Sequence, residues 1–182
     1  MRHKSVGLIQ VYTGGGKGKT TAALGLIVRA VGAGKRVCFV QFDKGGAHYS
    51  ERCVLVEQFG DAVDFHPTGL DRIDPANGRF RFGVTPEDRA EAERGLALAL
   101  AALGGGYDLV VLDEINTSVS LGLLAADAPE KILAAKHADT ELVVTGRDCP
   151  PALLDAADLV TEVREVRHYF RKGVPARAGF DY

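Results

Sequence analysis

Thr13-Gly14-Gly15-Gly16-Lys17-Gly18-Lys19-Thr20-Thr21 is the stretch that decides the fold of this chain. It follows an apolar run, residues 7–12, that predicts a buried strand, and it precedes a helical pattern over residues 21–31. A strand, a glycine-rich turn, Lys-Thr and a helix in that order are typical of a phosphate-binding loop. Closely spaced glycines let successive N–H groups converge on one anion, and the helix start adds positive charge there. We therefore expect Lys19 at the outer phosphates and the Thr20 hydroxyl at magnesium.

The match departs from the general phosphate-loop pattern at one position, because Thr13 stands where that pattern has glycine. The tighter core Gly-x-Gly-x-Gly-Lys-Thr is intact and carries an added lysine, Lys17. A merely tight connection between strand and helix is the plain alternative, but a bare turn has no need of Gly-Lys-Thr-Thr opening a helix. A dinucleotide fingerprint is disfavoured, because Lys19 stands where its third glycine would be.

Length and composition favour one globular domain over residues 1–182, with 46% hydrophobic residues and a formal net charge of −2. This charge predicts no global attraction to nucleic acid or to a membrane. No apolar run approaches the roughly 20 residues that span a bilayer, and no signal-peptide core precedes the first strand, so we expect a cytoplasmic protein. The three cysteines have no metal-binding or redox spacing and are expected to be free thiols, with Cys38 inside a strand.

The chain then alternates strand and helix. Residues 37–40 predict a second buried strand, and ligand groups are expected in residues 41–46, since sites lie at the carboxyl ends of such strands. A short helix is expected to start within residues 47–52, and residues 54–59 are expected to lead toward another edge element. Residues 65–85 show no sustained period and predict a long loop, which in a compact domain is typically functional or disordered.

Two carboxylates close the next predicted strand. A helix capped by Thr85 runs to Leu103, and the strand at 109–112 ends in Asp113-Glu114. An acidic residue at such a strand end resembles the second signature of phosphate-loop enzymes, where it holds magnesium directly or through water. A simple helix cap is the alternative, and the upstream phosphate loop favours the metal.

The rest of the chain completes an α/β pattern. A helix is expected from Asp127, a strand at 141–145, a helix from Pro150 and a last strand at 159–166, and the cationic tail after it is expected to be a solvated surface. Arg147 follows a strand end and is either a phosphate partner or half of an ion pair. A guanine-reading motif is disfavoured by the glycine at 146. This alternation predicts a mostly parallel sheet covered on both faces and leaves the strand order open.

Several segments together resemble the phosphate-loop class of ATP:corrinoid adenosyltransferases, and the resemblance covers nearly the whole chain. Thr before the glycine-rich core is usual in that family, which accounts for Thr13. The segments that carry it are residues 12–23, Arg29 to Gly34, Val40-Gln41-Phe42 with Lys44-Gly45, Tyr107 to Asn116, Thr145-Gly146-Arg147 before Pro150-Pro151, Ala156 to Glu162, and the Gly-x-x-Ala-x-x-Gly ending from Gly173 to Gly179.

The resemblance implies a RecA-like, three-layer α/β/α fold and transfer of the 5′-deoxyadenosyl group of ATP to the Co(I) of a reduced corrinoid, with the whole triphosphate leaving. It also implies a homodimer, Mg²⁺ or Mn²⁺, and a flavodoxin-type or other flavin reductant. By the same resemblance, Lys19, Thr20 and Glu114 would be catalytic. Thr20, Asp113 and Glu114 would hold the metal, with Glu114 on the side opposite Thr20 and Asp113 beside it. The substrates would be bound by Thr13, Gly14, Gly15, Gly16, Lys17, Gly18, Lys19, Thr20, Thr21, Arg29, Gln41, Arg147, Phe80 and Phe82.

The corrinoid side departs from the family pattern. Members often carry Phe-x-Trp in the long middle loop to cover the lower face of the corrin, whereas this chain has Phe80-Arg81-Phe82 and contains no tryptophan. Because the sequence given starts at the first strand, we expect no counterpart of the N-terminal segment that helps to cover the site in longer members. The choice among cobalamin, cobinamide and cobyrinic acid diamide stays open, as does a role in synthesis or salvage. A RecA-like ATPase or nucleic-acid-binding module and a nucleotide-dependent regulator without chemistry are the alternatives, and the negative net charge disfavours nucleic acid.

Overall fold

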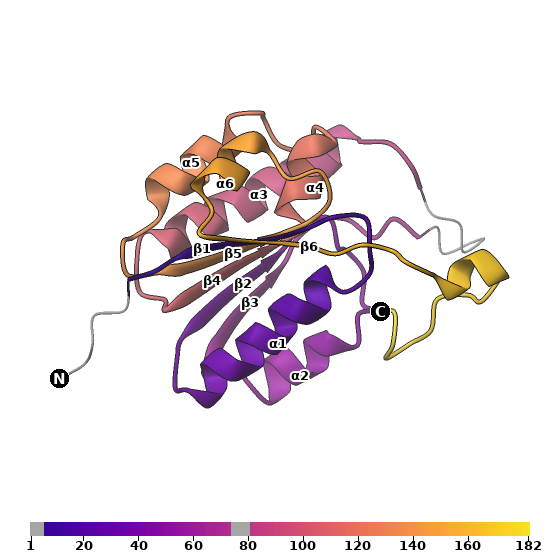
Figure 1. Ribbon diagram of the computed structural model, residues 1–182, viewed down its shortest axis with the longest axis horizontal. Helices are drawn as coiled ribbons and strands as arrows, with labels where there is room; N and C mark the ends of the chain where they lie inside the picture. The colour runs from indigo at the N-terminus through magenta and orange to yellow at the C-terminus, as the bar shows by residue number, and fades with distance from the viewer. Residues whose placement is uncertain (1–5, 74–80) are drawn as a thin grey trace.

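The computed structural model describes residues 6–73 and 81–182, which build one sheet with helices on both sides (Figure 1). Residues 1–5 and 74–80 lie outside these ranges, and so does the prediction for Phe80. The elements are β1 (Ile9–Thr13), α1 (Lys19–Gly32), β2 (Val37–Gln41), α2 (Glu51–Glu57), β3 (Val63–Pro67), α3 (Pro86–Leu103), β4 (Leu109–Asp113), α4 (Ile115–Ser120), α5 (Ala128–Ala135), β5 (Glu141–Thr145), α6 (Pro151–Ala156), β6 (Leu159–Glu162) and a 3₁₀ turn η1 (Tyr169–Lys172).

The sheet has the strand order β3-β2-β4-β5-β1-β6, and every pairing among these strands is parallel. The expected parallel α/β fold is thus confirmed. Because all strands run the same way, their carboxyl ends lie at one edge. There the last residue of β2, Gln41, pairs with Asp113 at the end of β4, and Tyr12 of β1 pairs with Thr145 of β5.

Two apolar cores on opposite faces of the sheet make the three layers. Side chains alternate along a strand, so Val37 and Phe39 of β2 face one core while Cys38 and Val40 face the other. The first core packs against α1 and α2, and the second packs against α3, α4, α5 and α6, as the two sides of the ribbon show (Figure 1). Cys38 is buried within β2 as expected, and burial raises the pKa of its thiol to about 12.

The edge of the sheet differs from the sequence-based expectation. Residues 54–59 were expected to lead into an edge element, but α2 begins at Glu51 and runs to Glu57, and the edge strand is β3, Val63–Pro67. The apolar residues at 54–56 belong to a helix of which only one side is covered, because Leu55 is buried while Val54 and Val56 are exposed. The expected helix start within residues 47–52 agrees with α2, which begins at Glu51, whereas the expected loop over 65–85 begins inside β3.

The helix that follows the long loop, α3, begins after Thr85 and ends at Leu103, as the sequence predicts. Thr85 accepts a hydrogen bond from the backbone of Asp88, whose side chain in turn accepts from the Thr85 backbone, so the two residues form a capping box before Pro86. The last strand is shorter than expected, since β6 ends at Glu162. In the described parts of the chain, none of the helices has the length and apolar character to cross a membrane.

Candidate functional site

The glycine-rich stretch forms a loop between β1 and α1, as its sequence predicts. Gly14 and Gly18 adopt positive φ angles of 103° and 124°, which glycine adopts without steric cost. The buried Lys19 ammonium donates to the carbonyl oxygens of Gly14 and Gly16, at 2.7 and 2.9 Å. Burial lowers the pKa of Lys19. The lysine therefore lies inside the curl of the loop, beside the N-terminus of α1.

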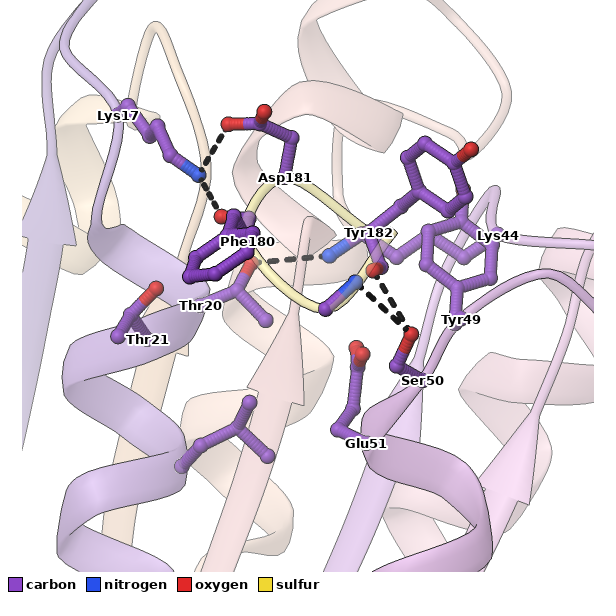
Figure 2. Close-up of a pocket in the computed structure, with 12 residues that line it drawn as sticks. Lys17, Thr20, Thr21, Lys44, Tyr49, Ser50, Glu51, Phe180, Asp181 and Tyr182 are labelled. Atoms are coloured by element: carbon purple, nitrogen blue, oxygen red, sulfur yellow. Dashed lines mark hydrogen bonds and ion pairs between the residues drawn. The ribbon is translucent and has the colours of Figure 1, made fainter. Parts of the chain in front are cut away.

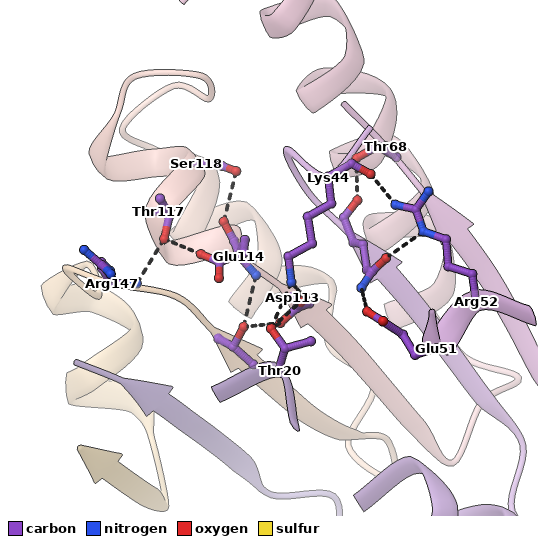
Figure 3. Close-up of polar contacts among 12 residues, drawn as sticks. Thr20, Lys44, Glu51, Arg52, Thr68, Asp113, Glu114, Thr117, Ser118 and Arg147 are labelled. Carbon is purple, nitrogen blue, oxygen red and sulfur yellow. Dashed lines mark hydrogen bonds and ion pairs between the residues drawn. The ribbon is translucent and has the colours of Figure 1, made fainter. Parts of the chain in front are cut away.

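A polar cluster at the carboxyl edge of the sheet joins α1 to β4 (Figure 3). The Thr20 hydroxyl lies 3.0 and 3.2 Å from the two carboxylate oxygens of Asp113, which is fully buried. The Lys44 ammonium lies 2.6 Å from Asp113 Oδ2 and 2.9 Å from Thr20 Oγ1. The Thr145 hydroxyl, at the end of β5, donates to Asp113 Oδ1 at 2.6 Å. Asp113 thus receives hydrogen bonds from three elements and carries a compensated charge.

Glu114 is oriented differently from its neighbour. Its φ of 62° places it in the left-handed region, its N–H donates to Thr145 Oγ1 at 3.0 Å, and its carboxylate accepts from Thr117 Oγ1 at 2.6 Å. Sequence reasoning favoured Glu114 for the place opposite Thr20, but the structure gives that place to Asp113. Strand geometry explains the exchange, because Asp113 is the last residue of β4 and Glu114 begins the turn into α4.

Lys44, Thr145 and Thr117 are the members of the site that sequence reasoning did not select as site residues. Lys44 and Thr145 share one signal, since each lies at or just after the carboxyl end of a buried strand, where ligand groups gather. The loop that carries Lys44 is held by Arg52, whose guanidinium donates to the carbonyls of Lys44 and Gly46 and lies 4.6 Å from the ring centre of Tyr49.

A cavity of about 250 Å³ opens over the glycine-rich loop. It is lined by the cations Lys17, Lys19 and Arg147, by the other residues of the loop from Gly15 to Thr21, and by the carboxylates Glu114, Glu165 and Asp181. The Arg147 backbone is fixed by a 3.0 Å hydrogen bond from its N–H to Thr117 Oγ1, while its side chain is exposed. Cations and backbone N–H groups around one cavity suit a polyphosphate.

The remaining predicted residues lie elsewhere. Arg29 is exposed near the far end of α1, and Gln41 is buried beneath the loop, where it contacts Glu51 and Arg52. Neither residue lines this cavity. Phe82 is 85% exposed in the long loop, next to Arg81, whose guanidinium makes a two-pronged ion pair with Asp88 at 2.7 and 2.9 Å.

A second cavity, of about 460 Å³, adjoins the first on the α2 side (Figure 2). Lys17 and Thr20 line one wall of this cavity, Tyr49 and Glu51 line another, and residues 179–182 close it. The last residues of the chain therefore lie against the glycine-rich loop, where the sequence had indicated only a solvated surface.

Comparison with known proteins agrees with this geometry. The family model for ATP:corrinoid adenosyltransferase BtuR/CobO/CobP matches residues 5–182. Corrinoid adenosyltransferases of Pseudomonas aeruginosa and Escherichia coli K12 are 36% and 38% identical, each over 97% of this chain and over 84% and 86% of their own lengths. An uncharacterized protein of Nostoc, all2391, is 37% identical over 96% of this chain, which spans only 48% of that protein.

A solved structure, that of the flagellar accessory protein FlaH from Methanocaldococcus jannaschii, shares the fold alone. It aligns with a TM-score of 0.56 over 87% of this chain and 71% of FlaH, at 12% sequence identity. The family model matches residues 5–182, and the two corrinoid adenosyltransferases are more than 30% identical to the chain. This chain therefore belongs to the ATP:corrinoid adenosyltransferase BtuR/CobO/CobP family.

Proposed function

We propose that this chain transfers the 5′-deoxyadenosyl group of ATP to the Co(I) centre of a reduced corrinoid and releases triphosphate. The observation that carries the proposal is the family match over residues 5–182, joined to a phosphate-loop cavity with Lys17, Lys19 and Arg147 on its walls. In this reaction the electron pair of Co(I) forms a bond to C5′ of ATP. The C5′–O bond breaks, its electron pair leaves with triphosphate, and cobalt becomes formally Co(III).

The loop residues act on the leaving group. Negative charge grows on the departing phosphate oxygen, and cations that are already in place stabilise it without reorganisation at the moment of reaction. Lys19 donates to carbonyl groups of the loop, and both Lys19 and Lys17 line the cavity that would hold the triphosphate. Because the attacked atom is carbon, the loop has to hold the phosphates and leave the 5′-carbon accessible.

We also propose a divalent cation, Mg²⁺ or Mn²⁺, beside Thr20 and Asp113. The donors fit, because a hydroxyl and a carboxylate are hard oxygen ligands and the Lys44 ammonium already lies against both groups, which marks a position that favours positive charge. In the described ranges, no group of three or more His, Cys, Asp or Glu side chains is arranged to hold a metal, so phosphate oxygens would complete the ligand set. The cation would supply further charge stabilisation to the triphosphate.

Phe82 is the residue proposed for the corrinoid side. Its ring is 85% exposed, and Arg81 next to it is tied to Asp88 at the start of α3, which fixes the backbone at this point of the loop. An apolar ring on a fixed loop suits the lower face of a corrin. We expect Phe82→Ala to lower the turnover of reduced corrinoid while the Kd for ATP stays nearly unchanged. Val56→Ala, which also removes an exposed apolar side chain, is the control.

The deciding experiment is product identification under strict anaerobic reduction. Protein, ATP, magnesium and reduced cobalamin should give a light-sensitive Co–C spectrum and one triphosphate per corrinoid. Formation of ADP and phosphate, or ATP binding without a spectral change, would reject the proposal in favour of an ATPase or a regulator. Parallel assays with cobinamide and cobyrinic acid diamide would identify the preferred corrinoid.

Three attributes of the family are extended to this chain as proposals: a homodimer, a cytoplasmic location and electron supply by a flavodoxin-type or other flavin reductant. The family relationship is their only support. Light scattering of the purified protein tests the first, and turnover with a reduced flavodoxin in place of a chemical reductant tests the third.

A further inference from the structure

The end of the chain reaches the glycine-rich loop through one lysine. The Lys17 ammonium lies 2.9 Å from Asp181 Oδ1 and also donates to the carbonyl oxygen of Phe180 (Figure 2). We call these two contacts the clasp and residues 177–182 the tail segment. Lys17 and Asp181 line both cavities described above, so the clasp lies at the boundary between them.

The tail segment is anchored at two further places. Ser50, just before α2, donates to the carbonyl oxygen of Tyr182 at 2.9 Å and accepts from the Gly179 N–H at 3.2 Å. The second place is Tyr169, whose hydroxyl donates to Asp181, and within the tail segment Asp181 also accepts from the Arg177 backbone N–H at 3.0 Å and from Arg177 Nε at 3.2 Å. The tail segment therefore crosses from the loop to α2 as an ordered piece of chain.

Asp181 places a negative charge beside Lys17, Lys19 and Arg147 in a cavity that Glu114 and Glu165 also line. Hydrogen bonds from Tyr169 and Lys17, together with Arg177, hold the pKa of this carboxyl well below its usual range, so it stays ionised. A carboxylate beside bound phosphates is repelled by them. A role in which Asp181 stays in place and helps to bind the triphosphate is therefore disfavoured.

We propose that Asp181 is an internal competitor of the triphosphate for Lys17, and that it thereby sets how tightly the protein holds its polyphosphate substrate and product. The inference rests on the proposed function for the identity of that polyphosphate. When the triphosphate binds, the Lys17 ammonium passes from the carboxylate to phosphate oxygens; when it leaves, the clasp forms again. The exchange is feasible because Asp181 keeps Arg177 and Tyr169 as partners after Lys17 has turned away.

The test is the binding of inorganic triphosphate and of ATP by titration calorimetry, without any corrinoid. Asp181→Asn keeps the shape of the side chain and removes its charge, so it should tighten both ligands by roughly tenfold at low salt. Asp139→Asn is the matched control, because it removes one exposed carboxylate at the opposite edge of the sheet and should change neither Kd. An unchanged or weakened affinity in Asp181→Asn would overturn the competitor role.

A double-mutant cycle separates competition from plain repulsion. Lys17→Met should weaken triphosphate binding, and in that background Asp181→Asn should give a clearly smaller gain, because only the repulsion between carboxylate and phosphates remains. A gain of equal size with and without Lys17 would mean that the carboxylate merely repels phosphate, and it would reject the clasp.

A second variant keeps the proposal testable if Asp181→Asn disturbs the tail. Ser50→Ala loosens the anchor on α2 without touching any charge and should tighten triphosphate binding in the same direction by a smaller factor, and weaker binding would contradict the proposal. These measurements need no corrinoid. If the wild-type protein showed no adenosyl transfer while the variants showed the predicted changes in Kd, the proposed function would be rejected and the competitor role of Asp181 would be supported.

Discussion

At the residue scale, Asp113 is the group at which hydrogen bonds from Thr20, Lys44 and Thr145 meet. It is fully buried, and its charge is balanced by Lys44 and by the hydroxyls of Thr20 and Thr145. A buried carboxylate that loses a partner keeps its desolvation cost, so each of these contacts has a stabilising role that is separate from binding. The two roles can be measured apart, because Thr145 is not among the residues that line the phosphate cavity.

Thr145→Val should therefore destabilise the protein. The hydroxyl donates to Asp113 and accepts from the Glu114 N–H, and valine leaves both groups without this partner at almost unchanged volume. We expect a loss of about 1–3 kcal/mol in the free energy of unfolding, measured by urea denaturation. Thr161→Val, on the exposed strand β6, should change it by less than about 0.5 kcal/mol. Equal effects of the two substitutions would show that the buried hydroxyl is not needed.

Asp88 connects the residue scale to the element that it caps. Its carboxylate accepts from the Thr85 backbone and from both arms of the Arg81 guanidinium. The Arg81 hydrogen bonds, followed by those from Thr85, hold the pKa of Asp88 well below its usual range. A carboxyl whose pKa is lowered by folding stabilises the protein above its unfolded pKa of about 3.9, and this contribution disappears as the pH falls through the folded value.

Asp88→Asn should accordingly lower the free energy of unfolding at pH 7, and the difference from wild type should shrink as the pH falls below about 4. Denaturant titrations across this range give the measurement. Asp127→Asn is a suitable control, since Asp127 precedes α5 but makes no side-chain capping bond. A difference that stays constant down to pH 2 would mean that the Asp88 charge does not contribute.

At the scale of elements, two helical glycines have opposite surroundings. A methyl group on Gly95 of α3 would lie 2.8 Å from the ring of Phe42 and from Thr68 Oγ1, so this glycine lets the helix approach the end of β2. A methyl group on Gly25 of α1 would meet no atom within 4 Å. Helix propensity alone favours alanine over glycine at both positions by about 1 kcal/mol.

Gly95→Ala should therefore lower the melting temperature, because the contact with Phe42 and Thr68 outweighs the propensity gain, whereas Gly25→Ala should raise it. Calorimetry of the two single variants gives the comparison, and each serves as the other's control. If both alanines stabilise, the packing of α3 against the strand end is looser than the structure indicates.

At the scale of the whole molecule, the features that the sequence predicted correctly are those determined by residues close together in the chain. The loop at 13–21, the buried strand ending in Asp113 and the capped start of α3 all carry their signals within a few residues. The edge of the sheet was predicted less well, because exposed apolar residues of α2 imitate a strand while β3 carries polar residues such as Asp64 and His66.

Contacts between distant parts of the chain gave no local signal at all. Thr145, a residue of the neighbouring strand, bonds to both the Asp113 carboxylate and the Glu114 N–H. The clasp joins Lys17 to the carbonyl of Phe180, 163 residues later. Neither partner follows from periodicity or motif spacing, because only the strand order β5-β1-β6 brings the end of the chain beside the glycine-rich loop.

The same topology explains one glycine of the loop. The Gly16 N–H donates to the Val163 carbonyl at 2.8 Å, and a methyl group on Gly16 would lie 2.7 Å from the Arg164 carbonyl carbon, whereas one on Gly15 would meet no atom within 4 Å. Gly16 is thus required by the segment that follows β6, independently of the proposed phosphate site. Gly16→Ala should lower the free energy of unfolding by about 2 kcal/mol in the absence of nucleotide, and Gly15→Ala by much less. Urea denaturation without ligand distinguishes the two, and equal losses would mean that the loop tolerates side chains independently of the strand beside it.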